Sequence, residues 1–285
     1  METRVIVQPV SMLFNINRES ADGRSIQEYT DWSKSLVQIF PNLFLFHDGI
    51  FDYADFGAHL PNQLLLHVNE LSISKRRKEI ERICTKYLAN GKMDLVYKLP
   101  DYGIVTSSKF ELLERVMSYI NADYYLWVDI GITRFLHGKI LNPIQIDNGL
   151  FSNYSSCFEA DLKGNIDFFR YLKGKGLLRS PKTGSSRRII GTGAFLIRKD
   201  YVSLYSSLIR NKLDSWLAND EWDTEQVAIG QLLSEIPYVS LHKQKRNTPT
   251  SFLDSLISNQ GLKLIDPRVC SILFGRRDKQ ALTKI

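Results

Sequence analysis

The stretch that decides the fold is YYLWVDIGITRF, residues 124–135. Its first five residues form an apolar run, which is typical of a strand covered on both faces of a sheet. Asp129 follows this run directly, and Gly131 could let the backbone approach a ligand closely. A carboxylate at the end of a buried strand needs a partner, because an unpaired charge is unfavourable to bury. A divalent cation on a diphosphate is one candidate partner, and a salt bridge or a helix cap is the alternative.

Apolar, strand-like runs alternate with amphipathic stretches on both sides of this central strand. We expect strands at residues 5–14, 43–46, 64–68, 94–99, 124–128, 189–197 and 238–241. We expect helices at residues 25–40, 74–89, 107–120, 201–217 and 224–233. Ser25 and Glu28 form a capping-box pattern at the start of the first helix. The alternation predicts an α/β fold with a mainly parallel central sheet flanked by helices.

The composition is that of an ordinary globular chain of 285 residues. Hydrophobic residues make up 44% and charged residues 24%, which argues against disorder and against fibres. No apolar run reaches the roughly 18–20 residues that a membrane span needs. The 3 cysteines are widely separated, which fits neither a disulfide framework nor a zinc cluster. We therefore expect a cytoplasmic protein.

The positive charge is concentrated near one end of the chain. The net charge is +6, and residues 239–285 hold 9 of the 37 Lys and Arg residues but only 3 of the 31 acids. Residues 168–199 form a second basic block, with 9 Lys or Arg and no acid. Two such blocks near a candidate site favour a polyanionic partner over a merely solvated surface. We expect a catalytic domain at 1–238 and a basic C-terminal extension at 239–285 that packs on or near the active site.

The chain resembles the HtrL/YibB (WlaTC-like) family of bacterial proteins, which are assigned to glycosyltransferases of the GT-A fold. The matching segments span residues 11 to about 233 and are VSMLFNINR, RSIQEYTDWSKSLV, NLFLFHD, SSKFELLERV, YYLWVDIGITRF, GTGAFLIRKD and TEQVAIGQLL. The most specific piece is W-V-D-x-G together with an upstream S-K-F. The resemblance implies a single GT-A-like domain that binds a nucleotide sugar.

The resemblance also implies roles for residues at the strand ends, where ligands of parallel sheets bind. Asp129 would hold Mn²⁺ or Mg²⁺ on the diphosphate, and His242 stands where many GT-A enzymes place a late metal ligand. The usual D-x-D motif has a second carboxylate, and this sequence has Gly131 in that place. Lys109 would face the diphosphate. The other residues expected to contact substrate are Asn15, Asn17, Arg18, Trp127, Arg187, Arg188, Gly191, Thr192 and Gly193.

An acidic cluster in NDEWDTEQ, residues 219–226, could cap the helix that follows it or supply a general base. In the resemblance it supplies the catalytic base, and Asp223 and Glu225 are the rival candidates. Trp127 is a special case among the substrate-binding residues, because its place in an apolar strand also favours the core.

These expectations describe a hexosyltransferase-like enzyme of the Leloir type. The donor would be a nucleotide sugar, most simply a UDP-sugar, and the acceptor a glycan or lipid-linked glycan of lipopolysaccharide, O-antigen or capsule. The basic extension would make a peripheral contact with the anionic inner face of the membrane. A sugar nucleotidyltransferase is the first alternative. A non-catalytic protein that binds nucleic acid is the second, although no nucleic-acid partner is expected.

Overall fold

The computed structural model describes residues 6–49, 62–131, 133, 166–172, 189–232 and 239–241. Seven strands form one sheet in the order β3-β2-β1-β4-β6-β5-β7. The strands are β1 (Val7–Leu13), β2 (Phe44–His47), β3 (Asn62–Leu65), β4 (Tyr124–Val128), β5 (Ile166–Leu172), β6 (Ile189–Arg198) and β7 (Val239–Leu241). Strand β6 runs antiparallel to both of its neighbours, and all the other pairs are parallel. The predicted α/β fold with a mainly parallel sheet is confirmed.

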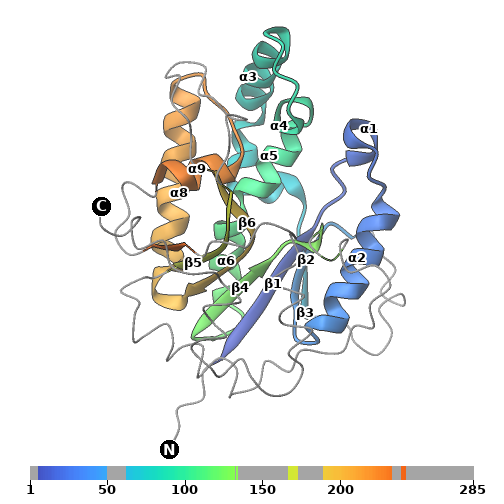
Figure 1. The fold of residues 1–285 in the computed structure, drawn as a ribbon, viewed down its shortest axis with the longest axis vertical. Coiled ribbons are helices and arrows are strands. Elements are labelled where there is room, and N and C mark those ends of the chain that lie inside the picture. Colours follow the sequence, from blue (N-terminus) through green and yellow to red (C-terminus); the bar gives the residue numbers. More distant parts are fainter. Residues whose placement is uncertain are drawn as a thin grey trace, which may run out of the picture.

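Helices flank the sheet, with α2 on one side and α8 on the other (Figure 1). The helices are α1 (Arg18–Asp22), α2 (Ile26–Ile39), α3 (Arg77–Ala89), α4 (Leu95–Lys98), α5 (Pro100–Ser107), α6 (Lys109–Met117), α8 (Val202–Ala218) and α9 (Glu225–Leu232). Short 3₁₀ turns occur at η2 (Val68–Glu70), η3 (Ser72–Arg76) and η5 (Lys199–Tyr201). Helix α2 begins with the predicted capping box of Ser25 and Glu28. None of the described helices is long and apolar enough to cross a membrane.

The sheet contributes side chains to a core on its α6–α8 face. Trp127 of β4 and Phe195 of β6 are paired across the two strands and stack at 6.3 Å between ring centres. Phe110 of α6 stacks on Phe195 at 4.9 Å. Leu126 precedes Trp127 in β4, so its side chain points to the opposite face of the sheet, and it is also buried. The strand is therefore covered on both faces, as its sequence predicted. This packing fixes β4 and the start of α6 against each other.

The prediction of a strand at residues 94–99 is wrong, because this segment forms the single-turn helix α4. Periodicity cannot separate a helix from a strand in so short an apolar run. Tyr97 stacks on Tyr87 of α3 at 4.8 Å, so helix packing rather than a sheet partner buries it. Helix α5 and strand β5 were not predicted. Strand β7 begins at residue 239, the first residue of the predicted C-terminal extension, and pairs with β5.

Candidate functional site

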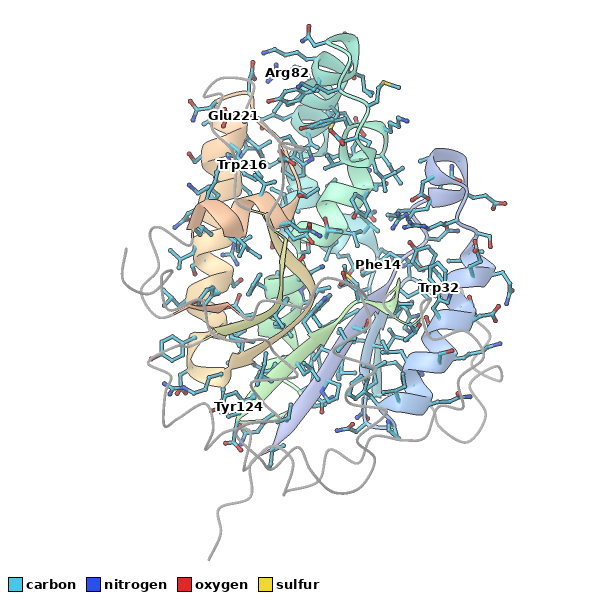
Figure 2. The ribbon with its side chains drawn as sticks, in the orientation of Figure 1. Phe14, Trp32, Arg82, Tyr124, Trp216 and Glu221 are labelled. Atoms are coloured by element: carbon cyan, nitrogen blue, oxygen red, sulfur yellow. The ribbon has the colours of Figure 1, made fainter. Side chains whose placement is uncertain are left out.

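Segments that are far apart in the sequence meet at the carboxyl end of β4. Figure 2 shows Tyr124, which begins β4, at the lower end of the sheet, so β4 runs upward toward α5 and α9. Strand β6 runs the opposite way and pairs Ala194 with Val128, so its residues before Ala194 lie at this upper edge. The backbone N–H of Asp129 donates to the carbonyl oxygen of Gly193 at 2.7 Å. The reversed direction of β6 therefore brings Thr192 and Gly193, which are expected to contact substrate, beside Asp129.

The ammonium of Lys109 lies at the centre of this edge. Its Nζ donates to Asp129 Oδ2 at 2.9 Å and to the carbonyl oxygen of Thr192 at 3.0 Å, and it lies 3.0 Å from Glu225 Oε1. The side chain is 1% exposed. Burial by itself lowers the pKa of Lys109, but the carboxylates of Asp129 and Glu225 raise it above its usual value. Lys109 is therefore a charged group held inside the protein, and its side chain joins α6, β4, β6 and α9.

Glu225 is the first residue of α9 and is the buried anchor of this network. Its Oε1 accepts a hydrogen bond from Thr192 Oγ1 at 2.6 Å, and its side chain is 4% exposed. Burial by itself raises the pKa of Glu225, but Lys109 and the Thr192 hydroxyl lower it below its usual value. Asp223, the rival candidate base, is 3% exposed, and its Oδ1 accepts from the backbone N–H of Thr224 at 2.8 Å. The structure places both candidate bases below the surface, and their catalytic roles stay predictions.

Asp129 is the most exposed of the three carboxylates, with 35% of its side chain accessible. Its Oδ1 accepts from the indole Nε1–H of Trp127 at 2.7 Å, and its Oδ2 accepts from Lys109. Burial raises the pKa of Asp129, and Lys109 and Trp127 offset only part of this rise. Trp127 itself is 0% exposed, so it orients the carboxylate from within the core. We shall refer to Lys109, Asp129, Glu225 and Thr192 as the Lys109 network.

The loop after β1 leads from Asn15 to Arg18 and holds three of the residues expected to contact substrate. The backbone N–H of Asn15 donates to Asp48 Oδ2 at 2.7 Å, which ties this loop to the end of β2. Asn17 adopts the left-handed conformation with φ of 55°, which Asn tolerates better than most residues. Its backbone N–H donates to Asn15 Oδ1 at 3.1 Å. The structure thus shows an ordered polar turn, and nucleotide binding by it stays a prediction.

Arg18 connects this loop to α5 through a residue that the sequence analysis missed. Its guanidinium carbon lies 4.8 Å from the ring centre of Tyr102. Burial raises the pKa of Tyr102 to about 12, and the charges of Glu225 and Lys109 also influence it. Tyr102 therefore contacts Arg18 and is near enough to the Lys109 network for its charges to act on the phenol. Its segment, PDYGIVTS, was assigned to no predicted element, so no sequence signal identified it.

Three predicted site residues lie outside the described residues: Arg187, Arg188 and His242. A fourth, Gly191, belongs to β6. Among the residues that the structure describes, no group of three His, Cys, Asp or Glu could hold a metal ion. The ammonium of Lys109 lies 2.9 Å from Asp129 Oδ2, so a metal ion at that oxygen would be repelled by a like charge. The described part of the site therefore does not fit Mn²⁺ or Mg²⁺ at Asp129.

Comparisons with known proteins gave matches to solved structures alone. No family model and no curated protein matches the chain, so the resemblance to the HtrL/YibB family stays a prediction. One matching structure is core-mannan synthase A from Aspergillus fumigatus in its Mn/GDP form, with 12% identity over 85% of this chain and 73% of that one and a TM-score of 0.47. An active-site mutant of LgtC matches with 12% identity over 92% and 81% of the two chains and a TM-score of 0.41. CMP:2-keto-3-deoxy-manno-octonic acid synthetase complexed with CTP matches with 10% identity over 88% and 97% and a TM-score of 0.39.

Proposed function

We propose that this protein is a glycosyltransferase that transfers a sugar from a nucleotide sugar to a glycan or lipid-linked acceptor. The observation that carries the proposal is the Lys109 network at the carboxyl end of β4. Residues that the sequence resemblance assigned to one active site, from four separate segments, contact one another there. UDP-sugars are the first donors to test. We propose that the enzyme acts at the inner face of the membrane in the assembly of lipopolysaccharide, O-antigen or capsule.

The reaction needs stabilisation of the leaving diphosphate and an acceptor for the proton of the attacking hydroxyl. Asp129 is the carboxylate that can touch a ligand, because the side chains of Glu225 and Lys109 are only 4% and 1% exposed. We therefore assign to Asp129 the hydrogen bond to the acceptor hydroxyl. Lys109 and Trp127 hold its two oxygens in place. Glu225 acts as a positioning residue, since it lies 3.0 Å from the Lys109 ammonium, which in turn donates to Asp129.

The test is a turnover assay on the purified full-length chain with a panel of nucleotide sugars, following release of the nucleoside diphosphate. Asp129→Asn should lower kcat by about 10²–10⁴-fold if the carboxylate assists proton transfer. Asp214→Asn is the matched control, because Asp214 is 52% exposed and pairs with Arg76 on the surface. Absence of turnover with every donor would contradict the proposal. Release of pyrophosphate from CTP and a free sugar would instead identify a nucleotidyltransferase.

A further inference from the structure

We propose that the ammonium of Lys109 occupies the position that a divalent cation would need beside Asp129, so that this site works without a bound metal ion. The inference rests on the proposed function only where it concerns turnover. Cation binding is a property of the protein alone and can be measured without any substrate. The two ideas can therefore fail separately.

The atoms around the ammonium are all oxygens. Lys109 Nζ lies 2.9 Å from Asp129 Oδ2, 3.0 Å from Glu225 Oε1, 3.0 Å from the carbonyl oxygen of Thr192 and 3.3 Å from its Oγ1. Two carboxylates, a carbonyl and a hydroxyl are the oxygen ligands that hard divalent cations take in proteins. In this chain the lysine ammonium fills the space between them. These four oxygen atoms have the chemistry of a metal site, and the cation among them is the ammonium of Lys109.

A second cation at Asp129 would have to bind an oxygen atom that already accepts a hydrogen bond. Oδ2 already accepts from the ammonium, and Oδ1 accepts from the Trp127 indole. A divalent ion bound to Oδ2 would sit within a few ångströms of Nζ, where the two positive charges repel with little water between them. The next two residues, Ile130 and Gly131, add no further carboxylate. The missing acid of the D-x-D pattern is thus explained if the site needs no metal.

The ammonium is also fixed in place. Lys109 begins α6, and the next residue, Phe110, stacks on Phe195 of β6 at 4.9 Å and on Tyr205 of α8 at 6.0 Å. These ring contacts hold the start of the helix against the sheet. Nζ also lies 5.8 Å from the ring centre of Trp127. These contacts and its three oxygen partners hold the Lys109 ammonium beside Asp129.

Two experiments on the full chain test this inference. The first titrates Mn²⁺ into the wild-type protein and into Asp129→Asn, and follows free Mn²⁺ by electron paramagnetic resonance. We expect the same free Mn²⁺ in both proteins, because Asp129 binds no metal. The second uses Lys109→Ala, which keeps both carboxylates and removes the ammonium. We expect Mn²⁺ to bind at least about tenfold more tightly than in wild type, because the vacated space is lined by hard oxygen ligands.

The double variant Lys109→Ala/Glu225→Gln is the matched control for charge. Removing one cation and one anion leaves the network with the same formal charge as in wild type, and it also removes one carboxylate ligand. We expect this variant to lose the gain in Mn²⁺ affinity. Thermal melting with and without Mn²⁺ gives a second readout, since a ligand that binds the folded state raises the melting temperature.

Tighter Mn²⁺ binding by wild type than by Asp129→Asn would overturn the inference, and so would a folded Lys109→Ala protein with no gain in affinity. If Lys109→Ala does not fold, the first experiment decides alone. In turnover assays, EDTA should leave the wild-type rate unchanged. If no donor supports turnover, the proposed function fails, and the Mn²⁺ titrations still decide the question of the cation.

Discussion

Two of the charge clusters among the described residues, each of three charges, differ in how deeply their cations are buried. In the Lys109 network one cation lies between two carboxylates, and the lysine side chain is 1% exposed. In the second cluster, on the surface, Asp220 pairs with Arg82 of α3 and, at 3.1 Å, with Lys86. Their side chains are between 39% and 56% exposed. Figure 2 shows Arg82 at the top of the molecule, at its surface.

The comparison shows that distance alone does not measure the importance of an ion pair. Water screens the surface cluster and can solvate each of its members if a partner is lost, so exposed pairs contribute little. The buried network has no such substitute. Lys109 and Glu225 are almost fully buried, so removal of one partner leaves an uncompensated charge inside the protein. The buried cluster should therefore respond strongly to mutation and the surface cluster weakly.

The largest effect is expected for Lys109→Met, which keeps the length of the side chain and removes its charge. The free energy of unfolding should fall by about 3–5 kcal/mol, because the carboxylates of Asp129 and Glu225 lose their buried counter-charge. Urea denaturation followed by circular dichroism measures this change.

Lys86→Met is the matched control, since it removes a lysine that also pairs with an aspartate but is 54% exposed. It should unfold close to the wild-type urea concentration. Similar midpoints for the two variants would remove the contrast between the buried and the surface cluster.

An intermediate effect is expected for Thr192→Val, a nearly isosteric change at a residue that is 0% exposed. The hydroxyl that donates to Glu225 Oε1 at 2.6 Å is lost, while the carbonyl that accepts from Lys109 remains. The protein should lose about 1–3 kcal/mol of stability, the usual penalty for a buried polar group deprived of one partner. Thr192→Ser keeps the hydroxyl and should recover most of this loss. A Thr192→Val protein as stable as wild type would show that the hydroxyl contributes nothing to the network.

The sequence predicted Asp129 because an apolar strand that ends in a carboxylate requires a partner. The identity of that partner could not be predicted. The structure shows a salt bridge to Lys109, which lies 20 residues earlier in the chain. The two side chains meet because α6 packs against β4, and Thr192 joins them because β6 runs antiparallel, which hydrophobic periodicity does not reveal. Thr192 was accordingly predicted to contact substrate and not to donate a hydrogen bond to Glu225.

Contacts between distant segments, which the sequence pattern does not reveal, also explain which helices and strands were predicted correctly. Helix α2 could be predicted because its signals are local: the capping box of Ser25 and Glu28 and an amphipathic pattern lie in one segment. The segment around Tyr97 was assigned to a strand because four to six apolar-rich residues satisfy either structure. Its helical state depends on the ring of Tyr87, ten residues away along the chain. Local sequence patterns predicted the correct secondary structure where tertiary packing favoured the same structure. They failed where packing alone selected between a helix and a strand.

The smallest effect is expected at the surface cluster, where Asp220→Asn should leave the melting temperature almost unchanged at neutral pH and moderate salt. Hydrogen bonds from Arg82 and Lys86 lower the pKa of Asp220 to about 2 from its usual 3.8. An acid whose pKa is lower in the folded state stabilises that state at any pH above the unfolded-state pKa of 3.8. This stabilisation is lost as the pH falls from 3.8 toward 2. Any difference in melting temperature between wild type and Asp220→Asn should therefore vanish across this acidic range.

Salt should weaken the same small contribution at neutral pH, because the screening length falls from about 10 Å at 0.1 M to about 3 Å at 1 M. The buried network should be much less sensitive, so the melting temperature of Thr192→Val should stay below that of wild type by the same amount at both salt concentrations. Differential scanning calorimetry of wild type and the two variants at each concentration measures both effects. Two results would contradict this comparison. One is a Thr192→Val difference in melting temperature that depends on salt. The other is a large Asp220→Asn difference in melting temperature that salt does not reduce.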